Sequence, residues 1–186
     1  MSSSFFACVL PKCGPSKETK STKKKVLSAP FYWFSLDETK GGGALIKEKA
    51  QELLCDSVDE EFVFGDFSPG ALSELQTKLQ GLGYEQAALR QLKAGVTDNT
   101  ANSVKQALTI MGLEGKSTPA VSAGAIFLGT GSKLAVPHNA LIERVFHFQL
   151  EGDKAIELPQ FPLRKDGQDV KEPEVVDVQL SDDELV

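Results

Sequence analysis

The chain has 186 residues, of which 41% are hydrophobic, and a formal net charge of −6. This length and apolar content suffice for one hydrophobic core, so we do not expect two full domains. No apolar run approaches the roughly 20 residues that a membrane-spanning helix needs. The three cysteines show no disulfide or metal spacing, which favours a reducing compartment, cytoplasmic or nuclear.

The charges are divided along the chain. Residues 1–25 carry +5, because six lysines face one glutamate, whereas residues 166–186 carry −7, because eight acids face one lysine. Residues 11–25 have almost no apolar content, so core burial cannot offset the entropy of ordering them. We therefore predict a flexible basic arm over 1–25, a core domain over 26–165 and a disordered acidic tail over 166–186.

The first predicted elements are a strand, a helix and a short strand. Aromatic and apolar residues from Phe31 to Leu36 are typical of a strand. An apolar stripe at helical spacing predicts a helix between Gly43 and Asp56, and Glu61 to Phe64 favour a short strand.

A helical cluster is predicted next, over residues 68–112. Ser68 and Pro69 form a typical helix start, with an N-cap and a proline at the first helical position. The spacing of Tyr84, Ala88 and Leu92 predicts a second helix, closing at Gly95. Thr97 or Asp98 can cap a third.

Strands are predicted after Thr118. A glycine-rich turn at 129–133 suggests a hairpin between Ile126–Leu128 and Leu134–Val136. Residues 144–150 alternate as a strand, and a three-residue loop would pair them with a strand at 154–158. The expected fold class is α+β: one domain whose helical cluster packs on a small antiparallel sheet formed largely from 120–160.

No catalytic or cofactor site emerges from the residues. The run Gly129 to Lys133 resembles part of a phosphate loop, but its serine precedes the lysine, the reverse of the required order. A cysteine nucleophile would need Cys55 beside His138 or His147, yet Cys55 lies on an amphipathic helix. We expect no catalytic residues, metal, cofactor or small-molecule substrate.

The basic arm is the most informative feature. Its positive charges attract phosphates, whether on lipid headgroups or on nucleic acid. Apolar residues precede the lysines and could enter a lipid interface. The candidate anion-binding residues are Lys12, Lys17, Lys20, Lys23, Lys24 and Lys25, and the candidate membrane contacts are Phe5, Phe6, Val9 and Leu10. The acidic tail could compete for the arm, engage a neighbouring copy's arm, or only aid solubility.

Several stretches resemble the matrix proteins of rhabdoviruses. These are the Met-Ser-Ser start, the lysine-rich arm, the run Leu27 to Glu38, the stretches 107–112 and 116–121, and the segment 134–137. The resemblance implies a virion structural protein that forms a layer beneath the envelope and condenses the nucleocapsid. Such proteins often carry a Pro-Ser/Thr-Ala-Pro budding motif; here Leu27 replaces the first proline, leaving Ser28, Ala29 and Pro30 as a remnant.

Two functional hypotheses follow. The first is a non-enzymatic, self-associating structural protein, similar to a viral matrix protein, whose partners are its own copies and anionic lipid or nucleocapsid RNA. It would lie peripherally at the inner membrane face and in virions. The alternative is a module that binds nucleic acid or a basic protein, with an autoinhibitory acidic tail.

Overall fold

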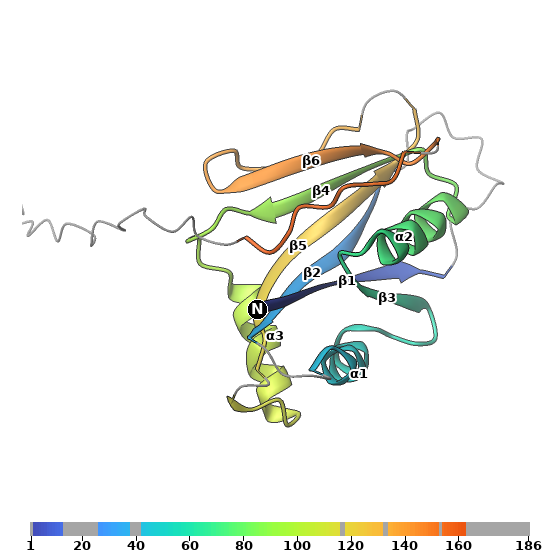
Figure 1. The fold of residues 1–186 in the computed structure, drawn as a ribbon. Coiled ribbons are helices and arrows are strands. Elements are labelled where there is room, and N and C mark those ends of the chain that lie inside the picture. Colours follow the sequence, from blue (N-terminus) through green and yellow to red (C-terminus); the bar gives the residue numbers. More distant parts are fainter. Residues whose placement is uncertain are drawn as a thin grey trace, which may run out of the picture.

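The computed structural model describes residues 2–12, 26–37, 42–115, 118–131, 134–152 and 154–162 (Figure 1). Within these ranges, helices pack on an antiparallel sheet with strand order β3-β1-β2-β5-β4-β6, which confirms the α+β class. In chain order the elements are β1 (Ser2–Pro11), β2 (Leu27–Asp37), α1 (Gly42–Leu54), β3 (Glu60–Asp66), α2 (Pro69–Gly81), β4 (Gln86–Leu92), α3 (Asn99–Ile110), β5 (Ala120–Gly129) and β6 (Glu143–Gln149).

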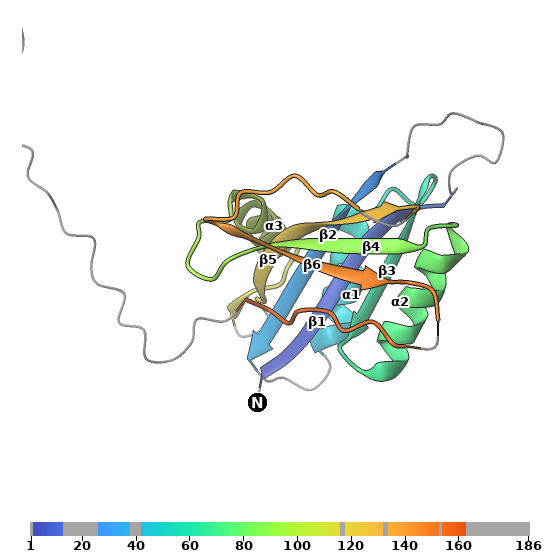
Figure 2. The same cartoon turned by 90° about the horizontal axis from the view of Figure 1, so that it is seen from above.

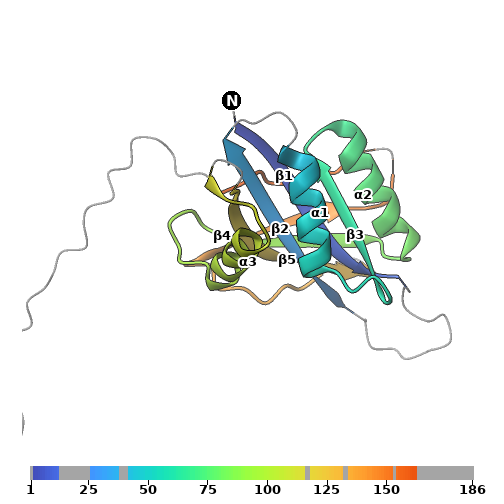
Figure 3. The ribbon, with the colours of Figure 1, turned by 90° about the horizontal axis from the view of Figure 1, so that it is seen from below.

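The sheet is covered on both faces. Helices α1 and α3 lie on one face, in front of the strands in Figure 3. The other face carries α2 and an extended segment, residues 150–162, which we call the strap; it crosses the sheet beside α2 in Figure 2. Strand residues alternate between the faces, so Phe31 and Trp33 of β2 belong to the α2 side and Phe34 and Leu36 to the α1 side.

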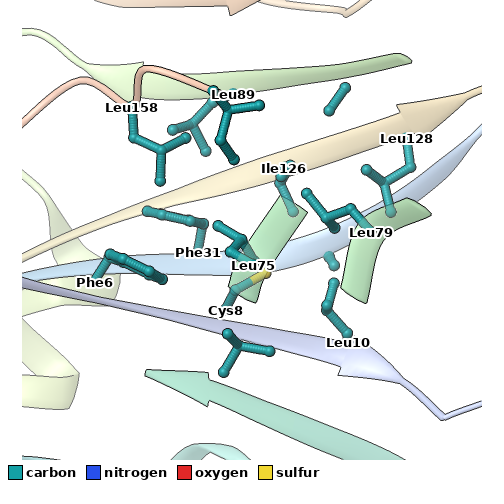
Figure 4. Packing of buried hydrophobic residues seen from close by; sticks show 14 of the residues in the cluster. Phe6, Cys8, Leu10, Phe31, Leu75, Leu79, Leu89, Ile126, Leu128 and Leu158 are labelled. Carbon is teal, nitrogen blue, oxygen red and sulfur yellow. The ribbon is translucent and has the colours of Figure 1, made fainter. Parts of the chain in front are cut away.

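The larger apolar cluster lies between the sheet, α2 and the strap (Figure 4). Phe6 stacks on Phe31 with ring centroids 5.9 Å apart, and Phe31 contacts Trp33 at 4.7 Å. Leu75 and Leu79 of α2 are fully buried in the same cluster. The sheet thus has an apolar interior on both sides, unlike a sheet with one wet face.

Two helix caps agree with the predictions. Ser68 precedes Pro69, and its hydroxyl accepts from the amide of Ala71 at 3.4 Å. Asp98 caps α3 by accepting from the Ala101 amide at 2.8 Å, while its second oxygen accepts from the Ala123 amide of β5 at 2.8 Å. The Asp98 carboxylate therefore also fixes α3 to the sheet.

The helix predicted from Tyr84 to Gly95 is wrong, because residues 86–92 form strand β4. It lies between β5 and β6, and its buried side chains include Ala87, Ala88 and Leu89. A strand covered on both faces loses the polar–apolar alternation that would identify it. The sheet is likewise not formed largely from 120–160, since β1 to β4 supply most of its strands.

The predicted hairpin of 144–150 with 154–158 is also wrong. Strand β6 pairs with β4, and residues 154–158 belong to no strand. Ile156 and Leu158 do face the core, at 4% and 8% exposure, but from the strap. Of the other predicted hairpin, Ile126 to Leu128 lie in β5, whereas Leu134 to Val136 are not a strand.

Candidate functional site

The segment of residues 12–25, which we call the lysine segment, connects two neighbouring strands. Strand β1 ends at Pro11, β2 begins at Leu27, and the two pair antiparallel with Cys8 opposite Phe31. Lys12 is held at the exit of β1: its amide donates to the Asp59 carbonyl at 2.9 Å, and its ammonium group donates to the Ser57 carbonyl. The other predicted lysines, Lys17, Lys20, Lys23, Lys24 and Lys25, lie outside the described residues.

The prediction of an N-terminal arm over 1–25 is therefore wrong for its first part. Ser2 to Pro11 form a strand with partners on both sides, β2 and β3. The core begins at this strand, not near Val26. The lysines follow a strand and precede another, so the fold anchors both ends of the segment that carries them.

The candidate membrane contacts belong to the core. Phe6, Val9 and Leu10 are at most 2% exposed, and Phe5 stacks on Phe64 with ring centroids 5.5 Å apart. This fold does not offer them to a lipid interface, which corrects the prediction. The signal was present in the sequence, since an unbroken apolar run bounded by Ser4 and a proline is typical of a strand buried on both faces.

The budding-motif remnant is also part of the sheet. Ser28, Ala29 and Pro30 lie in β2 and pair with Ala125 to Phe127 of β5. Ala29 is 3% exposed. Ser28 and Pro30 are exposed, but the backbone of all three residues is paired with β5. A partner that binds a free linear peptide would have to displace β2 from the sheet, so the structure argues against their use as a budding motif.

Exposed valines accompany the lysines instead. Val26, which immediately precedes β2, is 49% exposed, and Val58 is 75% exposed. Val58 lies in the loop that receives Lys12, where its amide donates to the Asp56 carboxylate at 3.0 Å. Asp56 and Asp59 share this loop, so the charge at this end of the sheet is mixed. Sequence reasoning missed both valines.

A second candidate is a hollow of about 200 Å³ beside the start of α3. It is lined by Tyr32, Arg90, Leu92, Asp98, Thr100, Ala123, Gly124 and Glu143. Burial, with the nearby carboxylates of Asp98 and Glu60, raises the pKa of the Tyr32 phenol. The phenol therefore stays neutral here and acts as a hydrogen-bonding group.

The charged groups of the hollow are engaged with the protein. The guanidinium of Arg90 donates to the Pro137 carbonyl at 2.9 Å, lies 3.6 Å from Glu143 and sits 5.2 Å from the Phe127 ring centroid. Both oxygens of Asp98 accept backbone amides. These bonds hold elements together, and the lining contains no paired nucleophile and base.

The cysteine and histidine candidates are not brought together in this hollow. Burial is the main cause that raises the pKa of the half-buried Cys55 thiol, which lowers its thiolate fraction. His138 lies 3.1 Å from the Val136 carbonyl, and neither His138 nor His147 lines the hollow. Among the described residues no cluster of three metal-binding side chains occurs.

Comparisons of the chain with protein-family models, curated protein sequences and solved structures gave no match. No helix in the described ranges is both long and apolar enough to cross a bilayer.

Proposed function

We propose that the chain is a non-enzymatic assembly protein that associates with its own copies and contacts an anionic surface through the lysine segment. The observation that carries the proposal is that Leu27, which follows the lysine segment, and Gln160, which precedes the acidic tail in the chain, lie towards opposite ends of β4. Leu27, after the lysine segment, pairs with Leu128, and Gln86 pairs with the adjacent Gly129. The strap instead reaches Gln91, near the other end of β4, through the carbonyl of Gln160.

The distance between these ends is large compared with a direct charge contact. The Trp33 indole, which donates to the Pro159 carbonyl of the strap, lies six residues along β2 from Leu27, which is roughly 20 Å at about 3.3 Å per residue. Copies arranged head to tail would place the −7 tail of one beside the +5 end of the next. This is a heterologous contact, and contacts of that type build rings or open chains of subunits.

The same lysines can bind an anionic membrane. A basic segment near such a surface gains about 1 kcal/mol per lysine, so the five lysines after Lys12 offer up to about 5 kcal/mol before competition from the acidic tail. Val26 and Val58 are the exposed apolar side chains that accompany the segment. In the form that the rhabdovirus resemblance favours, the protein would link an envelope to a nucleocapsid as a viral matrix protein.

Vesicle flotation tests the surface contact. The chain should float with vesicles containing phosphatidylserine and not with neutral phosphatidylcholine vesicles, and binding should fall steeply with salt. Replacing lysines 17, 20, 23, 24 and 25 by serine should abolish flotation, whereas replacing them by arginine should preserve it. Flotation that ignores both the anionic lipid and the serine substitutions would disprove the membrane contact.

Sedimentation and RNA binding separate assembly from the alternative. Self-association should weaken when residues 166–186 are removed or when the five lysines become serine. The alternative, a nucleic-acid module with an autoinhibitory tail, expects filter-retained RNA without self-association. Binding through five lysines would give a log–log salt slope of about −3.5 for single strands, and tail removal would tighten it.

A further inference from the structure

The strap fills a groove on the α2 face of the sheet. Leu150, Ile156 and Leu158 are buried in the main core cluster, and Phe161 packs against it. The residues between them are mostly exposed, so the strap alternates inward and outward as an extended peptide. It is nevertheless no strand of the sheet.

The Leu150 amide donates to the Glu85 carbonyl at 2.9 Å, which continues the pairing of β6 with β4. Beyond Leu150, side chains of the groove bind the main chain of the strap. The Gln76 amide donates to the carbonyls of Leu150 and Lys154 at 3.4 and 3.2 Å, and its oxygen accepts from the Ile156 amide at 3.3 Å. Gln76 comes from α2 and is 8% exposed. One glutamine thus contacts three peptide units on either side of the turn.

Two further side chains hold the end of the strap. The indole nitrogen of Trp33 donates to the Pro159 carbonyl at 2.8 Å, and the Gln91 amide donates to the Gln160 carbonyl at 2.9 Å. Trp33 is fully buried and Gln91 is 4% exposed. Polar side chains of the groove thus bind the backbone of the strap, while apolar residues of the groove contact its side chains. Grooves that bind extended peptides use the same division.

We propose that this groove also receives the strap of a second copy, so that neighbouring chains exchange residues 154–162 while Leu150 stays at the end of its own β6. The inference deepens the proposed self-association and rests on it. Exchange preserves the contacts of Ile156, Leu158 and the strap carbonyls, because the groove is identical in every copy. Residues 151–153 connect Leu150 to the exchanged segment. Glu151 and Gly152 are exposed, and Gly152 turns the chain with φ of +97°.

Concentration decides which strap occupies the groove. A short tether gives its own strap an effective concentration on the order of millimolar. The chain is therefore closed on itself at micromolar concentration. Exchange becomes competitive where copies are crowded at millimolar levels, as in a layer on a surface.

Deleting residues 151–153 in the full chain tests the proposal, because the strap could then no longer reverse onto its own groove. Light scattering after gel filtration should show at least a doubled mass. Trp33 is the single tryptophan of the chain, so native-like emission would report a filled groove. The same deletion combined with Ile156→Asp and Leu158→Asp should lose both the doubled mass and the native emission.

High salt separates this test from the one for charge-driven assembly. At about 1 M NaCl the screening length is about 3 Å, so contacts between acidic tails and lysine segments are lost while strap exchange persists. A deletion variant that stays monomeric with native Trp33 emission would overturn the proposal. Flotation and tail-dependent association could still hold in that case.

A labelled peptide decides the matter if the deletion variant does not fold. The peptide spans residues 150–162 and is added to the full chain carrying Leu158→Ala, which loosens the resident strap. Fluorescence anisotropy should rise with protein concentration, and a peptide with aspartate at positions 156 and 158 should bind at least tenfold more weakly. No rise with the native peptide would refute exchange.

Discussion

Gln76 provides the sharpest test of how the strap is held. Gln76→Leu keeps the volume of the side chain but removes its hydrogen bonds. The Leu150 carbonyl retains the Gln80 amide as a donor, and Lys154 is exposed to water, so neither carbonyl is left without a partner. The amide of the buried Ile156 has no such replacement.

The cost follows from this asymmetry. A buried donor left unsatisfied costs about 1–3 kcal/mol. The hydrogen bonds of Gln76 measure 3.2–3.4 Å, which is long for N–H···O bonds, so we expect a cost in the middle of that range and not at its upper end. We expect Gln76→Leu to lower the free energy of unfolding by about 2 kcal/mol.

Urea titration followed by Trp33 emission measures this change, with an unchanged m-value if only stability is affected. The matched control is Gln51→Leu on the exposed side of α1, which should stay within about 0.5 kcal/mol of the native chain. Equal stability of the two variants would refute the assigned role of Gln76.

Three further predictions address packing and ionisation. A methyl group at Gly124 would lie 2.3 Å from a backbone oxygen of β4, so Gly124→Ala should lower the free energy of unfolding, measured by urea titration, by about 1–3 kcal/mol. The control Gly81→Ala, which has open space around the added methyl group, should not lower it. Burial, aided by the carboxylates of Asp98 and Glu60, raises the pKa of the Tyr32 phenol above its unfolded value of about 10. Above that pH the folded chain therefore binds more protons than the unfolded chain, so the free energy of unfolding should fall as pH rises. The fall should be smaller in Tyr32→Phe. Burial also raises the pKa of the fully buried Cys8 thiol, so peptide mapping after thiol labelling should find Cys55 modified in the native chain and Cys8 only after unfolding.

The sequence predicted elements whose signals are local. The cap at Ser68, the stripe of α1 and the aromatic run of β2 each lie within one element, and the structure confirms them. Strand β4 was missed because its burial on both faces depends on β5, β6, α2 and the 134–136 segment. Its alanines and leucines fit a helix equally well until those partners are known.

The position of the lysine segment could not be foreseen for the same reason. Its charge is visible in the sequence, but its attachment at both ends depends on β1 pairing with β2 and β3. For the strap, the inward residues Ile156 and Leu158 were identified correctly while their partner was not. The alternation of apolar and polar residues predicts which side chains are buried, but it does not predict which part of the protein covers them.

The two proposed modes of association act on the same part of the chain. The strap leads from Gln160 directly towards residues 166–186, so a strap exchanged into a neighbour carries the −7 tail with it. Gln160, six residues before the tail, would then be bound to the neighbour's Gln91, at the end of β4 remote from the neighbour's own lysine segment. A third copy placed head to tail could meet the tail there with a lysine segment. Strap exchange therefore joins two copies, and contacts between acidic tails and lysine segments join such units into larger assemblies. High salt should break the charge contacts and leave the strap-exchanged units intact.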